Sequence, residues 1–321
     1  MRALAKLFLF TVVSILISCN NGKLSKKDAE RSLKVLNSDM INFGAELNEA
    51  TEMKALEFVM SAPENPFPVY KNTNRFISTK TFDFSQWHGI YEWSDYEKLF
   101  KKTGDSKNII LQIDNSELKD ISIIINDYQT EKVSSGEPFP KVCQIEITQN
   151  KKTIWEFDFT SKISNNLPED LKLRIKGESY QVNANLKRTT NGDSGKLFVD
   201  FTFKYLLKTL IKSKLDCNIG YSRQGYYFKQ LKLDQLLFGH HLAGDIDYAK
   251  VDPTAQDYAA SFNENSNLEL FENGRGKVGD LILATVENDE LVDYHIQFTD
   301  KSKALLGSYL PVFNKFINLK Y

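Results

Sequence analysis

The sequence predicts a mainly β protein of the α+β class. We expect a large curved antiparallel sheet, arranged as a half-barrel or sandwich, with an N-terminal amphipathic helix packed on it. Aromatic residues make up 12% of the 321 residues, and such side chains are favoured on the half-buried faces of strands. From residue 105 to 300, apolar and polar residues alternate with a period of two, which indicates antiparallel strands with one buried and one solvated face.

The helix is predicted by apolar residues that recur at spacings of four and three from Ala29 to Ala50, with charged residues between them. This pattern indicates one amphipathic helix of about 25 residues, which Ser25 or Asp28 could cap. A shorter helical segment follows at 52–60. The spacing would also suit a coiled coil with a partner, but three heptads are few, so we expect packing on the protein's own sheet.

The strand pattern is clearest at 155–160, 171–176, 182–187 and 199–204, and it returns at 268–271, 281–286 and 291–298. Turn-forming residues lie between these segments, and the most typical hairpin dipeptides are Asn191-Gly192 and Asn273-Gly274. Residues 206–215 fit either a strand or a helix, because their leucines form a stripe in both. Two further short helices are predicted, one at 253–262 with Asp252 as its cap and one at the C-terminus around Tyr309, Phe313 and Phe316.

The first residues have the pattern of an export signal. Two cations, Arg2 and Lys6, precede an apolar run that is too short for a membrane span. The run ends in Leu16-Ile17-Ser18-Cys19, which resembles the lipobox of bacterial lipoproteins. That resemblance implies that residues 1–18 are a lipoprotein signal peptide, that Cys19 carries the lipid, and that the protein binds the membrane through this anchor.

The residues after Cys19 bear on localisation, as the same resemblance implies. Asn20 replaces the Asp that favours retention in the inner membrane, and no acidic cluster follows, so we expect an outer-membrane anchor facing the periplasm. The predicted domains are the signal peptide (1–18), an anchor and N-terminal helical segment (19–65) and a β-rich globular domain (66–321). With 41 Lys and Arg against 42 Asp and Glu, the chain lacks the basic excess of a nucleic-acid-binding protein.

Cysteine and histidine residues give little support for metal or redox chemistry. Cys143 and Cys217 each lie in phase with apolar neighbours, which predicts either two separate buried thiols or a disulfide between them. His240, His241, Asp245 and Asp247 lie close enough in sequence to suggest a metal site, but they match no established ligand spacing. We therefore predict no metal and no cofactor.

The densest aromatic stretch includes Trp87, Tyr91 and Trp93, with Gln86, His88 and Glu92 among them. Such a surface could stack on a sugar or an apolar ligand, but on a strand the three rings would share one face and could equally form core. No phosphate-binding loop, nucleophile elbow or zinc-protease motif is present in the sequence, so no catalytic residue is predicted.

Three functions remain open from the sequence. The first is a non-catalytic binding or accessory lipoprotein, with a small hydrophobic or sugar ligand or an envelope protein as partner. The second is a carrier of a hydrophobic, lipid-like cargo, by resemblance to periplasmic carriers of lipoproteins or lipids, whose curved antiparallel sheets wrap a helix and enclose an apolar cavity. The third is a hydrolase. An apolar cavity would favour the carrier, whereas carboxylates or histidines that converge in a cleft would favour the enzyme.

Overall fold

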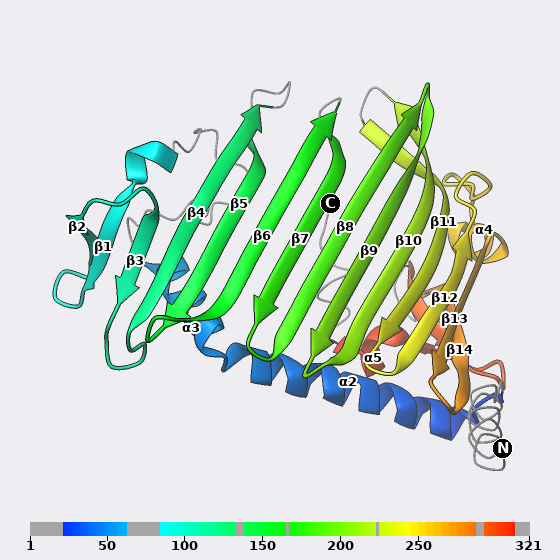
Figure 1. Cartoon of the computed structure of the whole chain (residues 1–321). Helices are drawn as coiled ribbons and strands as arrows, with labels where there is room; N and C mark the ends of the chain where they lie inside the picture. Colours follow the sequence, from blue (N-terminus) through cyan, green and yellow to red (C-terminus); the bar gives the residue numbers. More distant parts are fainter. Residues whose placement is uncertain are drawn as a thin grey trace, which may run out of the picture. The chain divides into compact units, whose positions relative to one another are not determined.

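The computed structural model describes residues 22–62, 84–132, 138–164, 167–222, 225–286 and 292–311. Sixteen strands form one open sheet in the order β16-β15-β14-β13-β12-β11-β10-β9-β8-β7-β6-β5-β4-β3-β1-β2 (Figure 1). Neighbouring strands along this order are antiparallel wherever their register is defined, except that β1 and β3 are parallel. The predicted mainly β fold with a large sheet and an N-terminal helix is confirmed. A sandwich would need a second sheet, and the described strands form one.

The chain divides into two compact units. Unit 1 comprises Met1–Phe43, Thr190–Lys196 and Leu210–Tyr321, and unit 2 comprises Gly44–Thr189 and Leu197–Thr209. The first nine strands are β1 (Gly89–Ser94), β2 (Leu99–Gly104), β3 (Ile109–Ile113), β4 (Ile121–Lys132), β5 (Pro138–Gln149), β6 (Lys152–Ser164), β7 (Leu167–Gly177), β8 (Tyr180–Asn191) and β9 (Ser194–Tyr205). The others are β10 (Lys208–Ser222), β11 (Gly225–Leu237), β12 (His240–Ile246), β13 (Ser266–Glu272), β14 (Gly276–Thr285), β15 (Val292–Gln297) and β16 (Lys303–Leu305).

Unit 1 has its core between strands and three helices, α2 (Lys26–Asn48), α4 (Tyr258–Glu264) and α5 (Leu306–Tyr309). The predicted amphipathic stripe is the buried side of α2, since Ala29, Leu33 and Leu36 are almost completely inaccessible to solvent. They join one hydrophobic cluster with residues of β13, β14 and β15. The expectation that this helix packs on the protein's own sheet is thereby confirmed.

The ends of the helices follow from their caps. Ser25 precedes α2, and its hydroxyl oxygen accepts a hydrogen bond from the Asp28 backbone N–H at 3.2 Å, as an N-cap residue does. The helix predicted at 253–262 begins later, because the carboxylate of Asp257, not that of Asp252, accepts the capping bond from Ala260 N–H. Asp252 instead accepts bonds from the backbone N–H and the hydroxyl of Thr254. The ambiguous segment 206–215 is a turn followed by β10.

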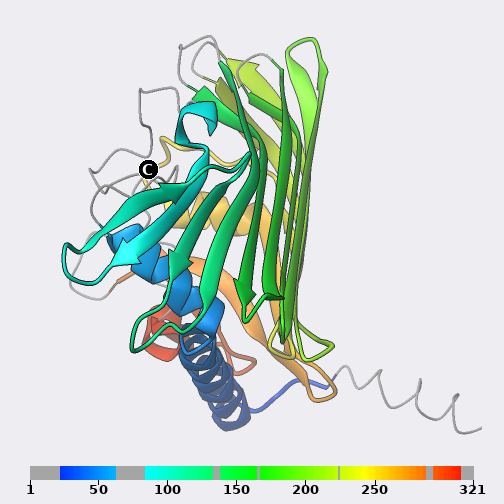
Figure 2. The same cartoon turned by 60° about the vertical axis from the view of Figure 1, so that its left-hand side comes forward.

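Unit 2 places helix α3 (Thr51–Ser61) against one face of its strands (Figure 2). Tyr180 at the start of β8 donates a hydrogen bond to the Met53 sulfur, and the Phe58 ring packs edge-on against Trp93 of β1 at 4.8 Å between centroids. α3 therefore runs across the strands from β8 to β1. The most deeply buried large side chains of strands β3, β4 and β5 are aliphatic, namely Ile109, Leu111, Ile113, Ile121, Ile123, Ile125 and Ile147.

Several predicted features lie outside the described residues. They are the signal peptide and lipobox with Cys19, the proline segment from Pro63 to Pro68, the turns at Asn165-Asn166 and Asn288-Asp289, and Phe313 and Phe316. No helix within the described ranges is both long and apolar enough to cross a membrane.

The packing of α2 can be tested by truncating one side chain of its buried stripe. Leu33 is 0% exposed, so Leu33→Ala should lower the free energy of unfolding by about 2–5 kcal/mol, because it removes buried methyl groups and leaves a cavity. Ile41 of the same helix is 50% exposed, and Ile41→Ala is the matched control with a much smaller expected effect. Urea unfolding followed by circular dichroism measures both, and equal losses would contradict this packing.

Candidate ligand-binding face

One side of the central strands of unit 2 is apolar. The register of β6 with β7 pairs Phe159 with Leu173, and that of β7 with β8 pairs Leu173 with Ala184. Side chains two residues apart on a strand point to the same side of the sheet, so the paired residues and their neighbours two positions away form one continuous surface. Its partly exposed members, which we call the apolar face of unit 2, are Phe157, Phe159, Leu171, Leu173, Ile175, Ala184, Leu186, Val199 and Phe201.

Strand β9 contributes to the apolar face of unit 2, and the buried residue Phe203 shows which side of β9 belongs to it. Tyr180 of β8 stacks on Phe203 of β9 with 5.9 Å between ring centroids and an angle of 8° between the planes. Because Phe201 and Val199 lie two and four residues from Phe203, their side chains point to the same side of the sheet. The apolar face therefore extends over at least four neighbouring strands of unit 2.

Burial on this face depends on the distance along the strand from α3. On β8, Tyr180 and Val182 are buried, but Ala184 and Leu186 are partly exposed. On β6, Trp155 is buried, whereas Phe157 and Phe159 are partly exposed. The contacts of α3 with Tyr180 and Gly177 lie at the buried end, so the helix covers one end of the face.

A buried arginine closes the other end. Arg188 is only 4% exposed and has the strand phase of Leu186, so its side chain lies on the apolar side of β8. Its Nε donates to the Pro168 carbonyl at 2.9 Å, and one terminal nitrogen donates to the carbonyls of Ser164 and Leu167. These bonds hold the adjoining ends of β6 and β7. The partly exposed middle of the face is thus bounded by α3 at one end and by Arg188 at the other.

The opposite side of the same strands is mostly charged or polar, with Phe198 of β9 as an exposed apolar exception. On β7 the exposed residues are Lys172, Arg174 and Lys176, and Lys176 pairs with Glu156 of β6 at 3.9 Å. This contrast between the two sides matches the predicted alternation. It also means that the apolar face is the side of this sheet region suited to a hydrophobic ligand.

The predicted aromatic platform is not one exposed surface. Trp87 lies on the 3-10 helix η1 (Phe84–Trp87), not on a strand, and is 39% exposed. Tyr91 is buried, and its hydroxyl donates to the Trp87 carbonyl at 3.0 Å. Trp93 packs against Phe58 and against Phe100 at 5.3 Å between centroids, and its indole N–H donates to Asp95. Tyr91 and Trp93 therefore contribute to packing in unit 2.

Trp93 also borders a polar surface cleft of about 680 Å³ in unit 2. Glu92, Gln112, Asp114 and Asp120 are among its other lining residues. Of the three predicted platform residues, Trp93 alone lines one of the clefts that we identify in the described residues.

The predicted metal candidates are dispersed. His240 is buried on one side of β12, while His241 on the other side lies 2.8 Å from the Asp234 carboxylate. Asp245 is exposed, and Asp247 pairs with Lys250 at 2.9 Å. Within the described part of the chain, no three His, Cys, Asp or Glu residues are grouped so as to hold a metal ion.

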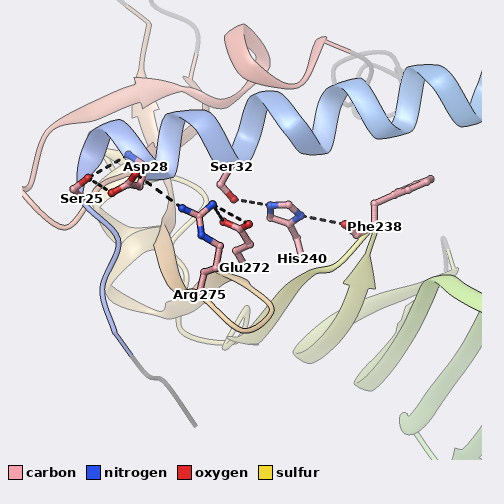
Figure 3. Close-up of polar contacts among 7 residues, drawn as sticks. All are labelled: Ser25, Asp28, Ser32, Phe238, His240, Glu272 and Arg275. Atoms are coloured by element: carbon pink, nitrogen blue, oxygen red, sulfur yellow. Dashed lines mark hydrogen bonds and ion pairs between the residues drawn. The ribbon is translucent and has the colours of Figure 1, made fainter. Parts of the chain in front are cut away.

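The buried His240 fastens α2 to the sheet of unit 1 (Figure 3). Its Nε2 lies 2.7 Å from the Ser32 hydroxyl, and its Nδ1 lies 3.4 Å from the Phe238 carbonyl oxygen. A carbonyl can only accept, so Nδ1 carries the proton and the Ser32 hydroxyl donates to Nε2. Both side chains are at most 3% exposed, so this pair has no access for a substrate and its role is structural.

A second polar group holds the start of the same helix (Figure 3). Arg275, in the turn between β13 and β14, donates two hydrogen bonds to the Glu272 carboxylate at 3.1 and 3.2 Å. Its other terminal nitrogen lies 4.0 Å from Asp28, which also accepts a bond from the Ser25 hydroxyl. Arg275 and Asp28 are nearly half exposed, so each pair contributes less than about 1 kcal/mol to stability.

The two cysteines within the described residues are buried, and neither forms a disulfide. Cys143 lies on β5 and Cys217 on β10, which are not neighbours in the sheet. Burial raises the pKa of the Cys143 thiol to about 12, helped by the charge of Asp127, and raises the pKa of the Cys217 thiol to about 11, helped by Asp216. Both thiols are therefore protonated and unreactive at neutral pH.

The structure contains two exposed apolar features that the sequence analysis did not single out. Tyr226, Tyr227 and Phe228 at the start of β11 are each more than 40% exposed, and the run of three aromatics was a signal for them. Leu206 and Leu207 form the turn between β9 and β10 and are 67% and 99% exposed. Their sequence gave no such signal, because a leucine pair more often marks core.

Comparison of this chain with protein-family models, with curated proteins and with solved structures found no match.

The His240 bond predicts a loss of stability in acid. Burial lowers the pKa of His240, while Glu272, Asp39 and the bonds to Phe238 and Ser32 oppose this shift only in part. The unfolded chain binds a proton below about pH 6.5 that the folded protein excludes, so the free energy of unfolding should fall as pH drops through this value. The slope from this one proton is at most about 1.4 kcal/mol per pH unit. His240→Gln removes the titrating group, and urea unfolding between pH 5 and 7.5 should give a flatter curve for it. Parallel curves would contradict this role.

Proposed function

We propose that the protein is a non-catalytic envelope lipoprotein that binds a hydrophobic, acyl-chain-like ligand on the apolar face of unit 2. The observation that carries the proposal is the partial exposure of that face between α3 and Arg188. Nine apolar side chains there remain partly accessible to solvent, although a sheet face normally gains stability by excluding water.

The chemistry of the face selects the kind of ligand. Its nine apolar side chains are aliphatic or phenyl, and the Ser161 hydroxyl, which shares their strand phase, already donates to the Pro140 carbonyl at 2.6 Å. The face can therefore exclude water from a hydrocarbon but has little means of recognising polar groups by hydrogen bonds. Each methylene buried there contributes about 0.8 kcal/mol. An acyl chain lying along one strand could therefore bind through burial alone.

The buried polar residues support binding rather than catalysis. Across the described residues these are Ser32, Glu52, Arg188 and His240. Ser32 and His240 are joined to each other, and Arg188 is occupied by backbone carbonyls. Burial raises the pKa of Glu52, in the first turn of α3, which fits a packed position beside Tyr180. A general acid and a base that converge on the apolar face would be needed for hydrolysis.

The envelope part of the proposal depends on the N-terminal sequence. The basic and apolar leader, the lipobox that ends at Cys19 and the Asn that follows support export, lipidation and an outer-membrane anchor facing the periplasm. Such an anchor would keep the apolar face of unit 2 close to a source of acyl chains.

The ligand proposal can be tested with a fatty acid that carries a photoreactive diazirine. After irradiation of the full-length protein in nanodiscs, cross-links should map by mass spectrometry to the peptides that contain Phe159 and Leu173. Leu173→Asp places a charge on the face and should reduce their yield roughly tenfold, since one well-buried leucine contact contributes about 1.5–3 kcal/mol.

Lys172→Asp is the matched control, because Lys172 is the next residue on the same strand and points to the opposite side. It should leave the cross-linking yield unchanged. Circular dichroism and the urea midpoint must show that both variants are folded. Equal cross-linking of the two folded variants would disprove binding on this face.

Lipidation is tested independently. Cells expressing the protein are labelled with an alkyne fatty acid, and Cys19→Ala should lose the label completely because the acceptor thiol is gone. Cys217→Ala is the control and should keep it, since that thiol is buried and unreactive. Equal labelling of Cys19→Ala and the wild type would refute the anchor.

A further inference from the structure

We propose that the turn between β9 and β10 in unit 2 is a membrane-contacting tip that inserts Leu206 and Leu207 into the surface of an anionic lipid bilayer. These two leucines are consecutive and are 67% and 99% exposed. Isolated exposed leucines are common on protein surfaces, but an adjacent pair at the outermost point of a hairpin is an unusual arrangement.

The backbone conformation of the turn is one that leucine does not favour, so turn formation does not explain why leucine occupies both positions. Leu206 and Leu207 have φ angles of +45° and +67°, the left-handed conformation that a two-residue hairpin turn of this kind requires. Asn and Gly adopt this conformation easily, whereas leucine does so with strain. The turn between β5 and β6 has the same left-handed pair at Asn150 and Lys151, with polar side chains.

A backbone hydrogen bond restrains the tip. The Leu206 backbone N–H donates to the Ser179 carbonyl at 2.8 Å, which ties this turn to the neighbouring turn between β7 and β8. The tip is thus a fixed projection, and its leucines are presented to solvent at small further cost in conformational entropy.

Cations surround the leucines. Lys204 and Lys208 flank the pair in sequence, and neither makes an ion pair with another described residue. At the base of the tip lies a cleft of about 350 Å³, lined among others by Arg174, Lys204 and Lys176, of which Lys176 pairs with Glu156 at 3.9 Å. The acidic residue in its lining, Glu178, is paired with Lys152 at 2.7 Å. Glu46 of α2 is also near, but it interacts with the Tyr205 hydroxyl.

This combination of two projecting leucines and a collar of cations matches one kind of partner. A bilayer with anionic headgroups offers an apolar layer within reach of the leucines and phosphate groups at the level of the lysines. Lysine side chains at such a boundary keep their charge in the headgroup layer while their stems lie along apolar surface. The tip would bring unit 2, with its ligand face, against lipid, although the tip itself does not depend on that face binding a ligand.

The experiment places an environment-sensitive fluorophore at the tip. Leu207→Cys introduces an accessible thiol for labelling, because Cys143 and Cys217 are buried with raised pKa values and the proposed lipid occupies the thiol of Cys19. Mass spectrometry of the labelled peptide verifies that position 207, and not Cys19, carries the fluorophore. The full-length protein is reconstituted into vesicles of phosphatidylethanolamine and phosphatidylglycerol that contain lipids with spin-labelled acyl chains. We expect blue-shifted emission and strong quenching by the acyl-chain labels.

Two controls define the result. Asp193→Cys carries the same label in the turn at the other end of β9 and should be neither shifted nor quenched. Lys204→Glu with Lys208→Glu, added to the protein labelled at position 207, should abolish the quenching while the circular dichroism spectrum stays unchanged.

Each contrary outcome overturns the proposal. Absence of quenching at position 207 means that the tip does not enter the bilayer, and equal quenching at 193 means nonspecific adsorption. Equal quenching in vesicles of phosphatidylcholine alone excludes the role of the cations. A blue shift without acyl-chain quenching identifies a protein surface, not a lipid, as the partner of the tip.

Discussion

A single sheet has two faces but cannot bury either of them against itself while it stays open, so every apolar row needs another element over it. This constraint explains most of the structure. In unit 1, α2, α4 and α5 cover the rows of β13, β14 and β15, and the result is a closed core. In unit 2, α3 covers one end of the rows and leaves the middle partly exposed. The proposed ligand face is the part of the sheet that this constraint leaves unsatisfied.

The same constraint explains where polar groups are buried. A helix laid on a sheet brings its own polar residues into the core, and each needs a partner because an unpaired buried polar group costs about 1–3 kcal/mol. Ser32 on α2 meets His240 on β12 in this way. Arg188 satisfies three carbonyls where β6 and β7 adjoin. A His–Ser pair resembles part of a catalytic site, but the burial of this pair indicates that its hydrogen bond stabilises the packing of α2 on β12.

The sequence predicted the strands and the long helix because their signals are local. Alternation at 171–176 determines which side of β7 is apolar, and the stripe from Ala29 to Leu36 determines which side of α2 is buried. Boundaries that depend on a choice between similar residues were less predictable: Asp252 and Asp257 are both good caps, and only the fold shows which carboxylate reaches a free backbone N–H. Residues 206–215 were ambiguous because their leucines form a stripe in a strand and in a helix alike, and the left-handed turn at Leu206 and Leu207 is one that leucine does not favour.

The candidate site was harder to predict than the fold, because it depends on which strand residues a helix covers and not on the alternation of apolar and polar residues. Alternation shows that Leu173 and Tyr180 lie on apolar rows, but nothing in the sequence shows that a helix covers Tyr180 and stops before Leu173. The aromatic cluster at 87–93 left two interpretations open from the sequence, a ligand platform or core, and only the fold shows that Tyr91 and Trp93 are packed against their neighbours. For a protein built on one open sheet, the functional question is therefore which apolar rows remain uncovered. That depends on the length and position of a few helices, which are tertiary properties of the whole chain.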